Sequence, residues 1–500
     1  MINQDKIKIT LFHLSSSGSN NYHLYHAASD ELRAKYDIKL LTEEQFRHSR
    51  YIDQSDVYIT THGEYLSPYD KINIDLWHGF PLKGMAKMDK QEQAANEDIQ
   101  KHWAKMDMIM SYSPLYNTAM NACNGANIRQ YRITGVPRND ALFSSESNAR
   151  LKVLYPQLDA EKETIAFFMP TFRKSVVTPN KIEGSKNFSN IFGLPELEKK
   201  KLLDFLEQSQ ITLVIKLHPF EESYFAKELE ELKSSKILIL NDGMLGNANM
   251  DLYDVLGAAD LLITDYSSVY IDYLLLNRPI IFLPTDLEEY KGNRGLLFEP
   301  YDFWTPGPKV YRQEELQHAI HQVLIGQDDY ADKRHTILKL CHSYQDNKSS
   351  ERIWGLIDDY IKEHLNVVLE RRQTFHAHKK MQQQIKQKIN GMIEQGHLAE
   401  ANKAVNQYLE SNEADSDIFA MNGMLHLLTG NPHEAIQTFE RGYQFFPWDE
   451  DLLYNLGYVY ESLGDDHSAL QHYIRARQQT TKSQLLALLD ERIAALSTDN

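Results

Sequence analysis

The stretch DLLITDYSSVYIDYLLLNRPIIFL, residues 260–283, contains the pattern that decides the fold. Its two short apolar runs, 260–264 and 279–283, predict strands, and the segment 268–276 between them predicts a helix. A strand, a helix that crosses over and a second strand form the unit from which parallel sheets are built. We therefore expect an α/β fold with a parallel sheet in this part of the chain.

The same alternation of short apolar runs and amphipathic segments extends toward the N-terminus. Further strands are predicted at 7–12, 56–60, 73–77, 106–110, 130–134, 164–169, 212–217 and 236–240, and further helices at 21–34, 90–104, 114–123, 195–208 and 221–233. A polar stretch near 144–162 divides the pattern into two sets. We predict two doubly wound α/β domains, residues 1–150 and 151–345, that face a cleft. Ligands of such sheets bind beyond the carboxyl ends of the strands.

Residues 391–500 have a different pattern, in which small and apolar residues recur every 34 positions. The residues that share this spacing are Gly396, Gly430 and Gly464, Ala401, Ala435 and Ala469, Gly423 and Gly457, and Val405, Phe439 and Tyr473. A period of 34 with turn glycines and small alanines is typical of tetratricopeptide repeats. We predict an all-α repeat domain that binds a protein partner or mediates self-association. The alternative is a plain helical bundle.

Residues 346–390 are expected to be connecting helices. The stretch 371–393 contains six Lys or Arg and no acidic residue. It fits a helix that faces anionic lipid, at about 1 kcal/mol per basic residue near such a surface, and it also fits a solvated linker helix. No apolar run reaches the roughly 20 residues of a membrane span, and the N-terminus has no signal-peptide pattern.

Composition and charge argue against several classes of function. The 500-residue chain carries 53 Lys and Arg against 70 Asp and Glu, a net charge of −17, whereas general binding of nucleic acid depends on basic side chains. Its two cysteines, Cys123 and Cys341, are too few for a disulfide framework or a four-cysteine zinc site. The sequence has no GxxxxGK(S/T) loop, no dinucleotide fingerprint and no HExxH or CxxC motif. We expect no nucleic-acid partner, no metal and no cofactor.

Side chains that can bind or react lie at the ends of five predicted strands. They are His78 in LWHGFPLKGM, Gly135, Arg138 and Asp140 in TGVPRND, Arg173 in FMPTFRK, Lys216 and His218 in VIKLHPF, and the two serines of TDYSS. A histidine at the carboxyl end of a strand is well placed as a general base, which contributes roughly 10²–10⁴-fold, although a lone histidine is more often structural. Lys216 and His218 are two residues apart, so in a strand both would point the same way. Five such strand ends together indicate one anionic substrate across the cleft.

Two further segments favour binding of phosphate. Ser267 or Ser268 is expected to cap the helix that follows the strand 260–264, and the free N–H groups of its first turn suit a phosphate or diphosphate. The alternative there is a capped helix without a ligand. Arg294 and Gly295 lie in a predicted loop rich in glycine and proline, where an arginine can make a bidentate contact to phosphate. Its alternative is a surface salt bridge.

Seven segments in this order resemble the CDP-glycerol glycerophosphotransferase family, which makes teichoic acids and related polyol-phosphate polymers. They are WHGFPLK (77–83), TGVPRND (134–140), MPTFR (169–173), KLHP (216–219), TDYSSVYID (264–272), RPIIF (278–282) and RG (294–295). The resemblance covers about residues 55–320. It implies a pair of domains similar to GT-B glycosyltransferases, and transfer of glycerol phosphate or ribitol phosphate from a CDP-polyol to a hydroxyl on a lipid-linked acceptor.

The resemblance also implies roles for individual residues. His78 matches the proposed base on the acceptor hydroxyl, His218 matches a second essential histidine near the donor diphosphate, and Ser267, Ser268 and Arg294 match the cradle of the donor phosphates. Further donor-side contacts are expected from Arg173, Lys216, Asp272, Gly135, Arg138 and Gly295, and acceptor-side contacts from Gly79 and Lys83. A helix N-terminus, an arginine and a protonated histidine would carry the charge that a metal carries in other enzymes. Phe80 departs from the family, which often has threonine at this position.

The sequence therefore predicts an enzyme that transfers glycerol or ribitol phosphate from CDP-glycerol or CDP-ribitol and releases CMP. The expected acceptor is linked to undecaprenyl diphosphate, or is a growing teichoic acid or capsule-type polymer. The expected location is cytoplasmic and peripheral, on the inner face of a bacterial cell membrane. Two alternatives stay open: a GT-B glycosyltransferase that uses a nucleotide sugar, and a repeat-based scaffold whose transferase half is inactive.

Overall fold

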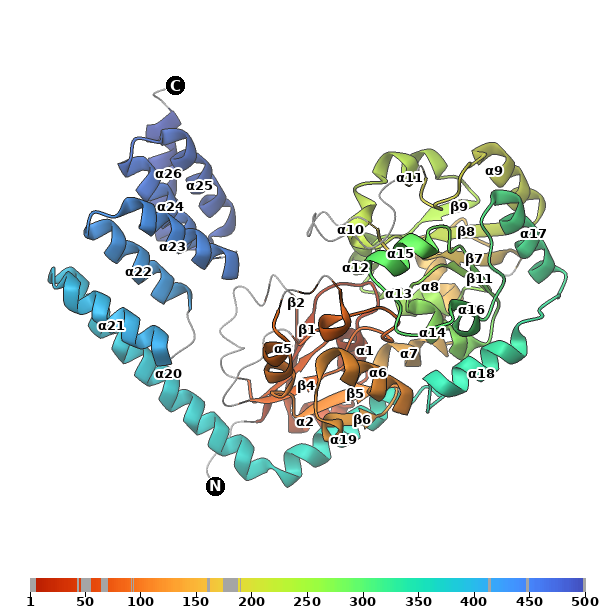
Figure 1. The fold of residues 1–500 in the computed structure, drawn as a ribbon, viewed down its shortest axis with the longest axis horizontal. Helices are drawn as coiled ribbons and strands as arrows, with labels where there is room; N and C mark the ends of the chain where they lie inside the picture. The colour runs from red at the N-terminus through yellow and green to blue at the C-terminus, as the bar shows by residue number, and fades with distance from the viewer. Residues whose placement is uncertain are drawn as a thin grey trace. The chain divides into compact units, whose positions relative to one another are not determined.

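The structure is a computed structural model of the chain. It describes residues 6–42, 45, 55–63, 71–90, 92, 94–159, 162–173, 188, 190–411, 415–446 and 449–497. The chain forms two compact units, residues 1–371 and 372–500. The first unit contains two parallel sheets with helices packed around them, and the second is entirely helical where it is described (Figure 1).

The first sheet has six parallel strands in the order β2-β1-β3-β4-β5-β6. Its strands are β1 (Lys8–His13), β2 (Asp37–Thr42), β3 (Val57–Thr60), β4 (Ile72–Asp75), β5 (Met108–Ser111) and β6 (Tyr131–Ile133). The helices of this half are α1 (Asn20–His26), α2 (Asp30–Lys35), α5 (Asn96–Trp103), α6 (Pro114–Asn124), α7 (Pro137–Leu142) and α8 (Ser147–Leu154). Every residue of β3, β4 and β5 is buried, as expected for a parallel sheet covered on both faces.

The second sheet has five parallel strands in the order β11-β10-β7-β8-β9. Its strands are β7 (Thr164–Phe168), β8 (Ile211–Ile215), β9 (Ile237–Ile239), β10 (Leu261–Thr264) and β11 (Ile280–Phe282). The helices of this half are α9 (Lys199–Gln208), α10 (Pro219–Glu222), α11 (Ala226–Leu232), α12 (Asp242–Asn247), α13 (Leu252–Leu256), α14 (Val269–Tyr273), α15 (Leu287–Asn293), α16 (Tyr301–Trp304), α17 (Gln313–Leu324) and α18 (Ala331–Cys341). The strand order reverses at the central strand β7, and the crevice at such a reversal is where doubly wound sheets bind ligands.

The predicted α/β fold class is confirmed, and the differences are local. Strand β2 was not predicted, because its residues alternate irregularly between buried and exposed. The segment 21–34, predicted as one helix, is two short helices, and the side chain of Ser29 caps the second by accepting a hydrogen bond from the Leu32 N–H. The predicted helix 221–233 is likewise divided between α10 and α11. In the first case the Ser29 side chain bonds to a nearby backbone group, which competes with the helix and interrupts it.

The chain returns from the second sheet to the first. Helix α19 (Ser349–Glu363) buries Ile353, Trp354 and Ile357 in the same apolar cluster as the strands of the first sheet. The Trp354 indole donates a hydrogen bond to the Leu24 carbonyl at 2.8 Å. Part of the segment 346–390, expected to be only a connection, therefore completes the core of the first half.

The second unit contains helices at the predicted 34-residue spacing. They are α20 (Leu365–Glu394), which begins before the unit boundary, α21 (Leu398–Ser411), α22 (Ser416–Leu428), α23 (Pro432–Phe445), α24 (Glu450–Ser462), α25 (Asp466–Gln479) and α26 (Ser483–Ser497). Three glycines end helices with positive φ angles: Gly396 (74°), Gly430 (82°) and Gly464 (75°). Residues 34 positions apart thus occupy equivalent places, and the predicted all-α character of this region is confirmed. The name tetratricopeptide stays a prediction.

The helix pairs pack closely where the sequence repeats its small residues. Ala401, Ala435 and Ala469 are fully buried. A Cβ atom at Gly423 would lie 2.4 Å from the Phe439 ring, so only glycine lets that ring pack on the neighbouring helix. Across the parts of the chain that the structure describes, no helix is long and apolar enough to span a bilayer.

Candidate active site

A cavity of about 520 Å³ lies between the carboxyl ends of the two sheets. It is lined by four basic side chains and three histidines: Lys83, Arg138, Lys216, Arg294, His62, His78 and His218. No carboxylate lines it among the described residues. In a chain with a net charge of −17, this wall composition makes the cavity a local site for an anion.

The ends of four strands bring most of these groups together. Thr61 and His62 follow β3, and His78 comes three residues after β4 ends. On the facing sheet, Lys216 and His218 follow β8, and Ser267 and Ser268 follow β10. The predicted pairing of His78 with His218 across a cleft therefore agrees with their placement on one cavity, and their chemical roles stay predictions.

The His78 ring is held in one orientation. Its Nδ1 atom lies 3.2 Å from the Thr61 carbonyl oxygen, which can only accept a hydrogen bond. Nδ1 therefore carries the hydrogen, and Nε2 of the neutral ring keeps its lone pair. The ring is also stacked on His62, with centroids 3.8 Å apart and an angle of 10° between the planes. His62 was not among the predicted site residues, because a lone histidine two residues after the predicted strand 56–60 carries no local motif.

The environment of His78 favours its neutral form. The ring is exposed to the cavity, yet protein atoms surround it at longer range and disfavour the charged state. This desolvation, together with repulsion from His62, Arg138 and Lys83, lowers the pKa of His78 well below its usual value. A neutral imidazole with an available Nε2 is the form required of a general base.

His218 has a similar electrostatic environment on the facing wall. Desolvation by the cavity wall, with repulsion from Lys83 and Lys216, lowers the pKa of His218 to about 4. We expected a protonated histidine to supply positive charge. The lowered pKa values favour the neutral form of His78 and His218 in the free protein, and the charge on a histidine during the reaction stays a prediction.

Lys216 does not lie in a strand as expected, because β8 ends at Ile215. Its buried ammonium donates hydrogen bonds to the Leu217 carbonyl at 2.7 Å and to Glu222 at 3.1 Å, and it lies 3.1 Å from a carboxylate oxygen of Asp242. These acids stand behind the lysine and do not line the cavity. They fix the position of the ammonium beside the cavity.

Ser267 and Ser268 line the cavity, but the expected capping is absent. Ser268 occupies the position before α14, and its side chain makes no capping hydrogen bond. A Cβ atom at Gly79 would lie 2.7 Å from the Ser268 Oγ. Gly79 is therefore needed because the two halves approach each other closely here, which places the Ser268 hydroxyl beside the His78 segment.

Arg294 and the segment around Lys83 join the two halves. Arg294 ends helix α15, where a loop was expected, and it forms an ion pair with Asp89 of the first half. Close by, the Leu297 N–H donates to the Leu82 carbonyl at 2.9 Å. The Lys83 ammonium lies 5.9 Å from the centroids of the Phe172 and Tyr290 rings. Two motifs far apart in the sequence thus form one wall.

Arg173 and Asp272 are not at the cavity, contrary to the prediction. The buried Arg173 guanidinium donates to Asp286 at 3.0 and 2.9 Å and pairs with Asp265. Asp272 is fully buried and accepts a hydrogen bond from Arg138 at 2.6 Å. Buried charges require partners, and each of these residues is held by one. The side chain of Arg138 reaches the cavity, whereas that of Asp272 orients it from behind.

Gly135 and Gly295 do not line the cavity either. Both have positive φ angles, of 72° and 80°, which favour glycine in a turn. A Cβ atom at Gly135 would also lie 2.5 Å from the Ser349 Oγ of α19. Their place in the motifs is explained by backbone conformation and close packing. Phe80, the departure from the family pattern, is buried against Tyr112, Tyr116 and Phe298.

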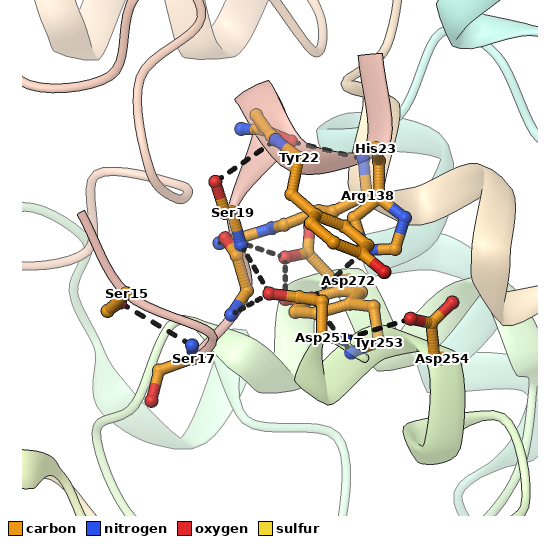
Figure 2. Close-up of polar contacts among 12 residues, drawn as sticks. Ser15, Ser17, Ser19, Tyr22, His23, Arg138, Asp251, Tyr253, Asp254 and Asp272 are labelled. Carbon is orange, nitrogen blue, oxygen red and sulfur yellow. Dashed lines mark hydrogen bonds and ion pairs between the residues drawn. The ribbon is translucent and has the colours of Figure 1, made fainter. Parts of the chain in front are cut away.

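A serine-rich loop after β1, which was not among the predicted site segments, also borders the cavity. Its signal was present in the run HLSSSGSNN, which follows a predicted strand and precedes a predicted helix. The Gly18 and Ser19 N–H groups both donate to Asp251 at 2.9 Å, and His23 lies 2.9 Å from the same carboxylate (Figure 2). A carboxylate of the second half thus occupies the N–H groups that a phosphate would use, and it fixes α1 across the junction.

A metal centre is not formed by the described residues. No group of three or more His, Cys, Asp or Glu side chains lies close enough together there to hold an ion. Cys123 and Cys341 are both buried and free.

Comparisons with known proteins agree with this geometry. A family model described as CDP-Glycerol:Poly(glycerophosphate) glycerophosphotransferase matches residues 9–358, beyond the range of the motifs and up to α19. The teichoic acid poly(glycerol phosphate) polymerase of Bacillus spizizenii is 24% identical over 323 residues, which cover 59% of this chain and 77% of the relative. The teichoic acid ribitol-phosphate polymerase TarL of Staphylococcus aureus is 29% identical over 222 residues, which cover 44% of this chain and 35% of the relative.

A solved structure has the same fold. The wall teichoic acid polymerase TagF superposes with a TM-score of 0.56 at 19% identity, over 71% of this chain and 90% of that one. The predicted GT-B-like arrangement of two doubly wound halves is consistent with this similarity.

Proposed function

Because the chain belongs to the CDP-glycerol:poly(glycerophosphate) glycerophosphotransferase family, we propose that its cavity binds the diphosphate of a CDP-polyol and transfers the polyol phosphate to an acceptor hydroxyl. One observation carries the proposal. Four basic side chains and three histidines line the cavity, and no carboxylate lines it among the described residues. The diphosphate of a CDP-polyol is the anion for which such a wall is suited.

We assign the basic groups to two tasks: they bind the two phosphates of the donor, and they stabilise the negative charge that develops during transfer. Arg138 and Arg294 are each fixed by a carboxylate behind them, so both guanidinium groups are held at the cavity wall before the donor phosphates bind. Lys83 and Lys216 add positive charge near His218. The Ser268 hydroxyl, brought close by Gly79, is a further donor. Preorganised donors of this kind stabilise the charge that builds up during phosphoryl transfer.

In the proposed reaction, His78 acts as the general base. Its Nε2 takes the proton of the acceptor hydroxyl as the oxygen attacks the β-phosphorus of the donor. The new P–O bond forms while the bond to the oxygen bridging the two phosphates breaks, and CMP leaves with that oxygen. His218 lies near Lys83 and Lys216, where a bound diphosphate would raise its pKa and let it donate a proton or hydrogen bond to the leaving phosphate.

We propose that the cavity needs no metal, since side chains supply its positive charge. Protein treated with a chelator should retain transfer activity. Inactive metal-free protein that Mg²⁺ restores would contradict this proposal.

The acceptor and location are proposed on the same basis. The expected acceptor is a hydroxyl on a polymer or linker attached to undecaprenyl diphosphate, reached by peripheral contact with the inner face of the membrane. The basic stretch 371–393 remains the proposed contact with the membrane, although two of its basic side chains lie near acidic residues of the chain. Arg371 lies near Asp107, and Lys386 pairs with Asp415 and Asp417. The helical repeats are proposed to bind a protein partner or a second copy.

Calorimetry tests the donor directly and needs no acceptor. The purified chain is titrated with CDP-glycerol, CDP-ribitol and UDP-glucose. Selective binding of one CDP-polyol supports the transferase and identifies the polyol. Binding of UDP-glucose alone would favour the glycosyltransferase alternative, and binding of none would favour the scaffold alternative.

A further inference from the structure

We propose that Asp75 is a positioning residue for the transfer reaction, and that it holds His62 and His78 as a stacked pair at the cavity wall. The inference rests on the proposed function, because it gives Asp75 a role in that reaction. The Asp75 side chain does not itself reach the cavity. Asp75 is the last residue of β4 and its side chain is fully buried.

The Asp75 carboxylate holds the ends of two neighbouring strands. Its Oδ2 atom accepts hydrogen bonds from the Thr60 hydroxyl and from the Gly63 N–H, both at 2.9 Å. Its Oδ1 atom accepts from the Trp77 N–H at 2.7 Å. One buried anion therefore fixes the segment that carries His62 and the segment that carries His78. Hydrogen bonds to an ionised acceptor are shorter and roughly twice as strong as neutral ones.

The bond to Trp77 stabilises an unfavourable backbone. Trp77 has a φ angle of 51°, in the left-handed region that a residue with a bulky side chain rarely adopts. Such a conformation is unfavourable for a residue other than glycine and persists only where the surroundings enforce it. Here it turns the chain sharply after β4, so that His78 faces the cavity. The acceptor that enforces it is Asp75.

The Asp75 carboxylate also acts on both histidines through Thr61, at the end of β3. The Thr61 hydroxyl lies 2.9 Å from His62 Nδ1, and the Thr61 carbonyl accepts a hydrogen bond from His78 Nδ1 at 3.2 Å. Thr61 lies between Thr60 and Gly63, and Asp75 accepts hydrogen bonds from both of these residues. The position of both histidine rings therefore depends on one carboxylate. The stacked contact between the rings then holds the plane of His78.

The consequence for catalysis is positional. His78 must present Nε2 to the acceptor hydroxyl in a fixed direction, and a misplacement of about 1 Å can cost roughly 10²-fold in rate. Asp75→Asn replaces one acceptor oxygen with an NH₂ donor. The amide then faces either the Trp77 N–H or the Thr60 and Gly63 donors, so one of the two segments is released.

The experiment measures kcat, KM and donor affinity with the full chain and the CDP-polyol that the wild type uses. Asp75→Asn is expected to lower kcat about 10²-fold, with the dissociation constant of the donor within about threefold of wild type by calorimetry. The matched control is Asp56→Asn. Asp56 is also buried in this sheet and accepts a backbone N–H, from Lys8 at 2.8 Å, but it lies at the opposite end of β3.

A second pair of variants guards against a folding defect. Thr60→Val keeps the shape and removes the hydroxyl that bonds to Asp75, whereas Thr60→Ser restores it. Thr60→Val should lower kcat about tenfold, because it removes one of the three hydrogen bonds that hold Asp75 and only part of that loss acts on His78. Thr60→Ser should recover most of it. The acid limb of kcat/KM, which reflects His78 facing His62, Lys83 and Arg138, should move with Thr60→Val and return with Thr60→Ser.

The outcomes separate this inference from the proposed function. A wild-type chain that transfers from no CDP-polyol would overturn the proposed function and with it the reaction in which Asp75 acts. An active wild type in which Asp75→Asn and Asp56→Asn behave alike would overturn the inference and leave the function standing. Equal losses in Thr60→Val and Thr60→Ser would also overturn it.

Discussion

The two sheets face one cavity with different chemistry. The first presents His62 and His78, two stacked imidazoles whose environment favours the neutral state of His78. The second presents the ammonium of Lys216, the guanidinium of Arg294 and a single imidazole, that of His218, while Lys83 and Arg138 add two cations to the first. A base must stay unprotonated and a diphosphate must be neutralised. The cations of the cavity serve both demands, because they disfavour protonation of the histidines and attract the donor.

The comparison shows that charges on one wall change the pKa of histidines on the other. The positive charges disfavour protonation of the histidines, since Lys83 lowers the pKa of both His78 and His218. The acids that balance the basic groups stand outside the cavity: Asp272 behind Arg138, Asp89 behind Arg294, and Glu222 behind Lys216. The acidic excess of the chain thus supports the cationic wall without entering it.

The largest effect is expected when the first wall loses its base. His78→Ala should lower kcat by about 10²–10⁴-fold, while the dissociation constant of the CDP-polyol stays within a few-fold of wild type. Steady-state kinetics and calorimetry measure the two quantities separately. His335→Ala is the control, because His335 is an exposed histidine of α18 away from the cavity. A His78→Ala variant that loses donor affinity and keeps kcat would contradict the assignment of His78 as the base.

Removal of a cation from the second wall should affect binding instead. Arg294→Met is expected to weaken donor binding about 10- to 100-fold, because hydrogen bonds to charged groups contribute about 1.5–3 kcal/mol. The substitution also leaves Asp89 buried without this partner, so thermal unfolding is measured alongside calorimetry. Asp89→Asn gives the opposite test, since it leaves the arginine charge less neutralised and should preserve or tighten binding. If both variants weaken binding equally, the ion pair is structural and the arginine does not contact the donor.

The coupling between the walls should appear in the pH profile. The pKa of His78 is lowered in the free protein, so kcat/KM should fall only as the pH drops well below 6.5 and protonates the base. Lys83→Met removes a positive neighbour and raises the pKa of both histidines. The acid limb should therefore move to higher pH, by up to about one unit. Lys83→Arg keeps the charge and should leave the limb in place. A limb that ignores the charge at position 83 would refute the coupling.

The sequence predicted the strand ends well and the partners of charged residues poorly. His78, Lys216, His218 and the serines of TDYSS were placed at the cavity because a motif at the end of a parallel strand can lie only at one edge of its sheet. Arg173 and Asp272 belong to the same motifs, yet both are buried in ion pairs. Local sequence shows that a charge follows a strand, and does not show which carboxylate lies across the fold.

His62 and Asp75 show the second limit. His62 matters because its ring stacks on His78, a contact between two strands that are adjacent only in the folded sheet. Asp75 ends an apolar strand and resembles an ordinary terminating residue in the sequence. The return of α19 to the first sheet was missed for a related reason, since its apolar face fits any sheet. The 34-residue spacing, by contrast, needed no tertiary information, because each repeat packs against its neighbours.

The smallest effect on transfer is expected from the helical unit. In Gly423→Ala the new methyl group meets the Phe439 ring, which should destabilise this unit by about 1–3 kcal/mol. Gly391→Ala is a matched control in α20, where a Cβ meets nothing within 4 Å and alanine should stabilise the helix by up to about 1 kcal/mol. Thermal unfolding measures both. With a water-soluble acceptor, kcat should stay unchanged in both variants, because neither wall of the cavity includes residues of this unit. A loss of kcat in Gly423→Ala alone would mean that the helical unit contributes to the reaction itself. The two walls of the cavity would then not account for transfer by themselves.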